Sequence, residues 1–239
     1  VRDIFKAEFH SLGNNLRQLI LTDFIRKDFQ IHLGDNSAQF TQLGVLSYFE
    51  SIRREIIEQS WTVPVAVLTG SLVIIPTSAK EHLERLIPNS RLSYDIIGQL
   101  SQEDYLKVSV SGSYHDLVTA LTQLFQDGYI KVIIGTKSLL GEGWDAPCVN
   151  SLILASFVGS FMLSNQMRGR AIRVWPDNPN KTSNIWHLVS INLSPRRWFE
   201  FQDDEEKYDE TLELRLYGLS PDLDLLDRRM TQFLGLHYT

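Results

Sequence analysis

Residues 131–173 read KVIIGTKSLLGEGWDAPCVNSLILASFVGSFMLSNQMRGRAIR, and this stretch decides the fold of the chain. It begins with a short β-branched run, 131–134, that stops at the Gly-Thr pair 135–136, the pattern of a buried strand that ends in a loop. A loop rich in glycine follows, and residues 151–155 read as a second strand. The pattern then predicts a helix over 159–175.

The predicted helix carries the side chains that suggest chemistry. Gln166, Arg170 and Arg173 are spaced i, i+4 and i+7, so a continuous helix presents them on one face. Arg168 points elsewhere on the same helix. Asp145 lies in the loop between the two strands, where the chain is held tight by glycine and proline. The stretch therefore combines a basic helix face with an acidic loop.

The loop and the helix together resemble parts of a known family. Residues 135–147 resemble motif V of superfamily-two helicases, and QMRGRAIR, residues 166–173, is similar to their motif VI, Q-x-x-G-R-x-x-R. The second motif follows the first at the strand-loop-strand-helix spacing, which makes the pair a specific signal. The resemblance covers residues 16–190 as a fold. Trp144 stands where many relatives have an aliphatic residue, and we expect it to pack against the core.

On both sides of this stretch the sequence predicts further strands, and upstream of it they alternate with amphipathic helices. Such alternation predicts βαβ crossovers and an α/β fold with a mostly parallel sheet and helices on both faces. The resemblance makes this a three-layer RecA-like (P-loop NTPase-type) domain, the second of two in a helicase motor. The expected strands are 17–25, 63–68, 72–76, 106–110 and 185–191, and the expected helices are 1–15, 45–57, 78–86 and 115–126.

Charge divides the chain into a body and a tail. Residues 200–239 contain 11 acidic and 4 basic side chains, whereas residues 1–199 contain 18 and 19, so the net charge of -6 comes from the tail. We expect a RecA-like domain over 1–199, including the N-terminal helix 1–15, and an acidic helical C-terminal extension over 200–239. Periodicity places helices of that extension at 204–217 and 223–234.

The resemblance implies a role in ATP hydrolysis. In such motors ATP and Mg²⁺ are held in a cleft between two RecA-like domains, and the second domain supplies arginines that reach the γ-phosphate. This assigns the catalytic role to Arg170 and Arg173, whose planar guanidinium groups are always charged. Gly143, Asp145 and Gln166 would lie near the nucleotide. Asp145 is expected to pair with the arginines, and the alternative is a plain turn residue.

The chain lacks the element that cradles phosphates in these motors. No G-x-x-x-x-G-K-[ST] occurs in the sequence, and GTKS at 135–138 has the residue types without the glycine spacing. We therefore expect ATP and Mg²⁺ in the complete protein and neither of them held by this chain alone. The expected partner is the N-terminal RecA-like domain of the same protein.

A second set of candidates follows the predicted strands. The carboxyl ends of parallel strands meet at one edge of the sheet, where α/β sheets bind ligands. By the resemblance, the residues at these ends contact the backbone of DNA or RNA, as hydroxyl and N–H groups commonly do. Ordinary turn chemistry is the alternative, and which Gly-Ser loop contacts phosphate stays open. The candidates are Thr22, Gly70, Ser71, Gly112, Ser113, Thr136 and Lys137.

Composition excludes several other classes of protein. The single cysteine, Cys148, excludes an internal disulfide and favours a cytoplasmic setting. No apolar run is long enough for a membrane span, and the first residues lack a signal-peptide pattern. One cysteine and six scattered histidines offer no metal-ligand spacing, so no metal site is predicted.

Three functions stay open on the sequence. The first is the C-terminal motor half of an ATP-dependent nucleic-acid helicase. The second is the translocase subdomain of a restriction or remodelling enzyme that moves along duplex DNA without unwinding it. The third is an α/β domain that binds a nucleotide or a partner without motor activity. Arg170 and Arg173 disfavour the third function, because a static binding module needs no pair of arginines that acts on a phosphoryl group.

Overall fold

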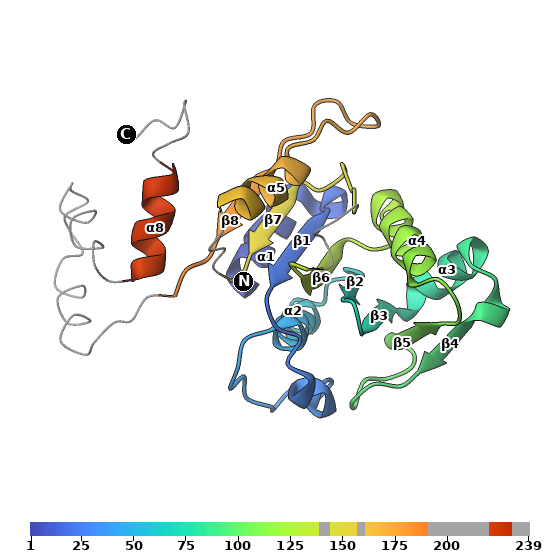
Figure 1. Ribbon diagram of the computed structural model, residues 1–239. Coiled ribbons are helices and arrows are strands. Elements are labelled where there is room, and N and C mark those ends of the chain that lie inside the picture. The colour runs from blue at the N-terminus through green and yellow to red at the C-terminus, as the bar shows by residue number, and fades with distance from the viewer. Residues whose placement is uncertain (139–143, 157–160, 191–219, 231–239) are drawn as a thin grey trace. The chain divides into compact units, whose positions relative to one another are not determined.

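The computed structural model describes residues 1–138, 144–156, 161–190 and 220–230 (Figure 1). The chain divides into two compact units, Val1–Trp186 and His187–Thr239. In the second unit, helix α8 covers Pro221–Met230. It begins two residues before the predicted helix 223–234, whose last residues lie outside the described part of the chain. The helix predicted at 204–217 lies outside the described residues. Each unit is considered by itself.

The centre of the fold is one eight-stranded sheet. Its strands are β1 (Gln18–Thr22), β2 (Val65–Leu68), β3 (Val73–Pro76), β4 (Leu92–Asp95), β5 (Tyr105–Val110), β6 (Val132–Thr136), β7 (Ser151–Leu154) and β8 (Asn184–His187). They lie in the order β4-β5-β3-β2-β6-β1-β7-β8. β2, β6, β1 and β7 are paired in parallel, and β3, β5 and β4 continue the sheet by antiparallel pairing. The predicted α/β class with a mostly parallel sheet is confirmed.

Helices cover both faces of this sheet. Leu19 and Leu21 of β1 belong to a core shared with side chains of α3, α4 and α5, and Ile20 between them points to the opposite face. On that opposite face α2 contacts β2 and β6 and also packs against α1, whereas α5 contacts β7 (Figure 1). The helices are α1 (Arg2–Leu12), α2 (Val45–Glu58), α3 (Lys80–Leu86), α4 (Tyr114–Asp127) and α5 (Phe161–Ala171), with short 3-10 turns at Gly13–Asn15, Lys27–His32, Thr77–Ala79 and Asn89–Arg91.

The strand register brings several predicted site residues to one edge. Thr22 lies opposite Thr136, and Leu68 lies opposite Gly135, so β1, β2 and β6 end at the same level. β5 is antiparallel to β3, which is antiparallel to β2, so the carboxyl end of β5 reaches this edge too. A Cβ at Gly135 would lie 2.5 Å from the carbonyl oxygen of Leu68, so glycine is required there by strand packing.

The strand β4 is absent from the sequence prediction. It has four residues and lies at the edge of the sheet, where Leu92 and Tyr94 are partly buried and Ser93 and Asp95 are exposed. Alternation over so short a segment is too weak to separate a strand from a loop. β3, α3, β4 and β5 together account for the extra length of residues 72–106, and they make this part of the sheet antiparallel.

Cys148 offers a simple probe of the folded state. Its side chain is buried in the core, and burial raises the pKa of the thiol to about 12. Because the thiolate is the reactive form, we expect a thiol reagent at pH 8 to leave the native chain unlabelled and to label it fully in denaturant. Labelling of the native chain at the rate of a free thiol would contradict the burial of this side chain.

Candidate nucleotide and nucleic-acid sites

Helix α5 is shorter than the sequence predicts. It ends at Ala171, so Arg173 lies two residues beyond the helix and not on it. Gln166 and Arg170 still share one helix face by their i, i+4 spacing. The prediction that Arg173 continues this face on the helix is therefore wrong.

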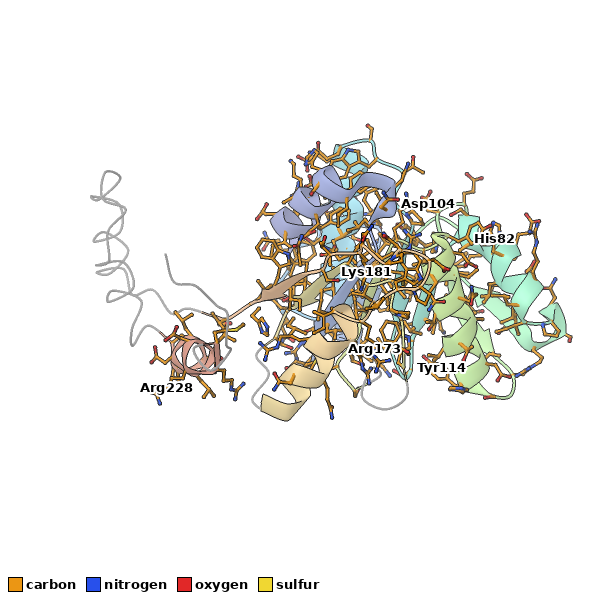
Figure 2. All side chains as sticks on the ribbon, turned by 90° about the horizontal axis from the view of Figure 1, so that it is seen from above. His82, Asp104, Tyr114, Arg173, Lys181 and Arg228 are labelled. Atoms are coloured by element: carbon orange, nitrogen blue, oxygen red, sulfur yellow. The ribbon has the colours of Figure 1, made fainter. Side chains whose placement is uncertain are left out.

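Two side chains from a later segment cap the helix end. The carbonyl oxygen of Ala171 accepts hydrogen bonds from Lys181 Nζ at 2.6 Å and from Ser183 Oγ at 2.7 Å. The same two groups donate to the carbonyl oxygen of Val149, at 2.7 and 3.0 Å. Val149 lies just before β7, so this clamp holds the end of α5 beside the amino end of that strand. Lys181 and Arg173 are labelled in Figure 2. Burial lowers the pKa of Lys181 in this position.

Arg173 reaches back to the loop that carries Asp145. Its Nη1 lies 2.7 Å from Asp145 Oδ2, and each side chain is 52% exposed. The expected pairing of Asp145 with an arginine of motif VI is present, which favours that interpretation over a plain turn residue. An exposed pair of this kind contributes about 0–1 kcal/mol to stability, so its main effect is to orient the two side chains.

Arg170 lies over the face of the sheet and not at its edge. With Met167 of the same helix, it lines a small cavity against Leu19, Leu21 and Leu152. The cavity measures about 10 Å³, room for about one water and far below the roughly 300–1,000 Å³ of ligand pockets. A nucleotide therefore cannot enter the domain here. Arg170 therefore lines no ligand-sized space at this place.

Arg170 and Arg173 lie close enough for their charges to interact. Burial, and then the neighbouring charge of Arg173, lowers the pKa of Arg170, while Asp145 opposes the shift. A guanidinium nevertheless stays charged in proteins, so both side chains are cations. The clamp places the end of α5 beside the amino end of β7, so Arg170 lies away from the carboxyl edge that carries Thr22 and Thr136.

The remaining candidates of this group differ in position. Gln166 is exposed on α5, whereas Gly143 lies outside the described residues. Arg168 donates to Asn165 Oδ1 within the same helix. Trp144 is buried, and its Nε1 donates to Thr122 Oγ1 of α4 at 2.8 Å, which confirms that it packs against the core.

At the carboxyl edge, Thr22 and Thr136 face each other and are both buried. The backbone N–H of Lys137 donates to the carbonyl oxygen of Thr22 at 3.0 Å. Lys137 Nζ lies 2.5 Å from Asp23 Oδ1, and the lysine side chain is mostly buried. Sequence reasoning missed Asp23. Asp23 and Lys137 each follow a threonine, and these two threonines pair across β1 and β6. The ion pair can therefore be foreseen only when the register of β1 with β6 is known.

The loop at Gly112 is filled by a side chain of its own domain. Gly112 has a left-handed backbone with φ of 107°, and a Cβ there would lie 2.9 Å from Arg91 Nη2. Arg91 also donates to the carbonyl oxygen of Ser111 at 3.1 Å and to Asp116 Oδ2 at 2.8 Å. Ser113 is the residue before the first turn of α4. The guanidinium of Arg91 thus occupies the space beside this loop.

The loop at Gly70 and Ser71 is open by comparison. No atom of the described residues lies within 4 Å of a Cβ built at Gly70, and both residues are exposed. The hydroxyl of Tyr114 donates to the carbonyl oxygen of Thr69, which ties this loop to the start of α4. Burial raises the pKa of Tyr114 to about 12, so the hydroxyl keeps its proton. Of the two Gly-Ser loops, the one at Gly70 is the more accessible to a ligand.

Among residues 1–138, 144–156, 161–190 and 220–230, no group of three or more His, Cys, Asp or Glu side chains is arranged to hold a metal ion. None of the helices within those same ranges combines the length and apolar character needed to cross a bilayer.

Two solved structures are similar to this chain at low identity. The C-terminal part of the Fun30 ATPase domain is 14% identical with a TM-score of 0.42, and the match covers 87% of this chain and 46% of that one. The Pyrococcus furiosus Hef helicase domain is 14% identical with a TM-score of 0.37, and the match covers 84% of this chain and 27% of that one. This chain therefore spans less than half the length of either. No protein-family model and no curated protein matches the sequence.

The two stretches that resemble helicase motifs lie together in this α/β domain. β1 lies between β6 and β7, and the loop after β6 is joined to the segment after α5 by an ion pair. This ion pair connects residues 135–147, which resemble motif V, to residues 166–173, which resemble motif VI.

Proposed function

We propose that this chain is the C-terminal motor half of an ATP-dependent nucleic-acid helicase. The observation that carries the proposal is the ion pair between Arg173 and Asp145. It brings the motif V and motif VI regions together and holds Arg173 close enough to Arg170 for their charges to interact. A domain without motor function has no need of two adjacent arginines beside a motif V-like loop.

In this proposal the catalytic contribution of the chain is positive charge. The N-terminal RecA-like domain of the protein would hold ATP and Mg²⁺. Arg170 and Arg173 would then approach the γ-phosphate from the face covered by α5, each binding oxygens with a planar fork of donors. Charge on the phosphoryl group is stabilised most in the transition state. Gly143, Asp145 and Gln166 are proposed as the neighbouring nucleotide contacts.

Nucleic acid would bind at a different place, along the carboxyl edge of the sheet. The open loop at Gly70 and Ser71 offers N–H and hydroxyl donors to a phosphate, and Thr22 and Thr136 mark the ends of the two central strands. Lys137 would exchange Asp23 for a phosphate oxygen. Such contacts position a strand without reading its bases. The candidates Gly112 and Ser113 would contribute only if Arg91 moved away.

The test compares the chain with and without its partner domain. We expect no ATP hydrolysis by the 239-residue chain, because the contacts that hold the triphosphate and Mg²⁺ belong to the other domain. The chain joined to the N-terminal RecA-like domain of its protein should release phosphate, and polynucleotide should accelerate this. Robust turnover by the chain alone that is abolished by changing its own residues would overturn the proposal.

A further inference from the structure

An exposed aromatic ring and a guanidinium lie together just beyond the end of β1. Phe24 is 55% exposed, and Cζ of Arg26 lies 4.3 Å from the centroid of its ring. Arg26 Nε donates to the carbonyl oxygen of Leu43 at 3.2 Å, and Leu43 is exposed as well. Phe24, Arg26 and Leu43 are called the Phe24 cluster. One face of the phenyl ring is covered by the guanidinium, and much of the side chain remains open to solvent.

The backbone around the Phe24 cluster is held in an unusual geometry. Arg26 has φ 58° and ψ 65°, the left-handed region that residues other than glycine rarely adopt. A Cβ at Gly44 would lie 2.5 Å from Arg26 Cγ and 2.7 Å from the carbonyl oxygen of Phe24. That oxygen also accepts a hydrogen bond from the N–H of Val45 at 2.8 Å. The ring and the guanidinium are therefore positioned by close backbone contacts and not by chance exposure.

The Phe24 cluster lies next to the proposed backbone contacts. Phe24 follows Thr22 by two residues, which span about 7 Å of extended chain. Thr22 is paired with Thr136 at the carboxyl edge, and the segment after β1 continues past the tip of that strand toward α2 (Figure 1). A strand of nucleic acid whose phosphates contact this edge would have its bases within reach of the ring.

We propose that Phe24 stacks on an unpaired base of the nucleic-acid strand, with Arg26 covering the opposite face of the ring. This inference rests on the proposed function and adds to it a specific base contact. An aromatic face backed by a guanidinium is a surface on which bases stack, whatever their sequence. With Lys137, which pairs with Asp23, the charged groups around the cluster are two acidic and three basic side chains. This small positive balance suits a nucleic-acid strand, and the exposed ring face supplies the contact to a base.

The test uses the full chain and short single-stranded oligonucleotides that carry 2-aminopurine at one position each. Stacking on Phe24 should change the fluorescence of 2-aminopurine at one position of the bound strand. Phe24→Ala should abolish that change and weaken binding about 5- to 150-fold, the loss expected for one stacked base. Phe24→Tyr should keep both properties. The dependence of binding on salt should stay the same, because counterion release arises from phosphate contacts.

Ile31→Ala is the matched control. Ile31 is 68% exposed in the 3-10 turn Lys27–His32 that follows the cluster, and it has no ring, so its replacement should change neither the fluorescence nor the affinity. Protection of Cys148 from a thiol reagent shows that each variant is folded.

If the unchanged chain binds and Phe24→Ala binds equally well at every probe position, stacking is refuted while the proposed function stands. If no oligonucleotide binds and polynucleotide fails to accelerate hydrolysis by the joined domains, both are refuted. A Phe24→Ala defect confined to hydrolysis without nucleic acid would indicate docking of the partner domain and would refute stacking.

Discussion

Replacing Arg170 by alanine should lower kcat for ATP by about 10³- to 10⁵-fold in the protein that joins this chain to its N-terminal RecA-like domain. The change in KM should be much smaller, because the guanidinium acts mainly where charge on the phosphoryl oxygens is redistributed. Steady-state phosphate release at saturating polynucleotide measures both parameters. Arg170→Lys should rescue poorly, since the ammonium keeps the charge and loses the planar fork.

Arg168 provides the control on the same helix. Its Nη2 donates to Asn165 Oδ1, and it points away from the face that Arg170 shares with Gln166. Arg168→Ala should therefore have a far milder effect on kcat. If Arg168→Ala proved as damaging as Arg170→Ala, or if the latter hydrolysed ATP normally, the placement of α5 against the nucleotide would be wrong.

Arg173 is paired with the carboxylate of Asp145. Its pair with Asp145 is half exposed, and the attraction of two unit charges about 4 Å apart in water is only about 1 kcal/mol. Exchange of Asp145 for a phosphate oxygen is therefore energetically easy. The position of Arg173 beyond the end of α5 also frees it from the helix geometry, so it can move further than Arg170.

The longest amphipathic helices were predictable from the sequence. The predicted helix 45–57 is observed as Val45–Glu58, and the predicted helix 115–126 is observed as Tyr114–Asp127. Both have a full apolar face over 14 residues, so the periodic signal is strong. Gly128 ends the second helix in the left-handed conformation, as a glycine after a helix often does.

The end of α5 was not predictable in the same way. Local sequence permits the helix to continue to the residue before Pro176, but Lys181 and Ser183 take the carbonyl of Ala171 from ten and twelve residues away. A cap formed by a later segment leaves no local signal. The position of β4 also leaves no local signal. It depends on antiparallel pairing with β5, and the segment between the two strands contains no helix.

Some contacts of the candidate sites can be predicted from motif residues, and others only from the register of the strands. The pair of Asp145 and Arg173 follows from motif residues alone, because the family pattern links them. The pair of Asp23 and Lys137 needs the parallel register of β1 with β6, which single-sequence patterns do not provide. The accessibility of Gly70 depends on the absence of a nearby side chain in the described structure, and only three-dimensional packing reveals it.

The segment that carries the Phe24 cluster is anchored by a buried charge network on α2. The side chain of Glu50 is 0% exposed, and its Oε1 lies 2.6 Å from Arg53 Nη2 and 3.0 Å from Arg54 Nε. Its Oε2 accepts the backbone N–H of Gly34 at 3.1 Å. Arg53 in turn donates to Asn36 Oδ1 at 2.5 Å. One carboxylate therefore pairs with two arginines and ties the loop to the helix.

Glu50→Ala should lower the free energy of unfolding by about 3–5 kcal/mol, because it leaves buried guanidinium charge without its partner. Glu58→Ala is the matched control on the same helix: Glu58 also pairs with an arginine, Arg2, but its side chain is 60% exposed, so the change should be within about 0.5 kcal/mol. Urea unfolding followed by circular dichroism gives both values. Equal losses for the two variants, or a loss below about 1 kcal/mol for Glu50→Ala, would show that Arg53 and Arg54 find water or other acceptors once the carboxylate is gone.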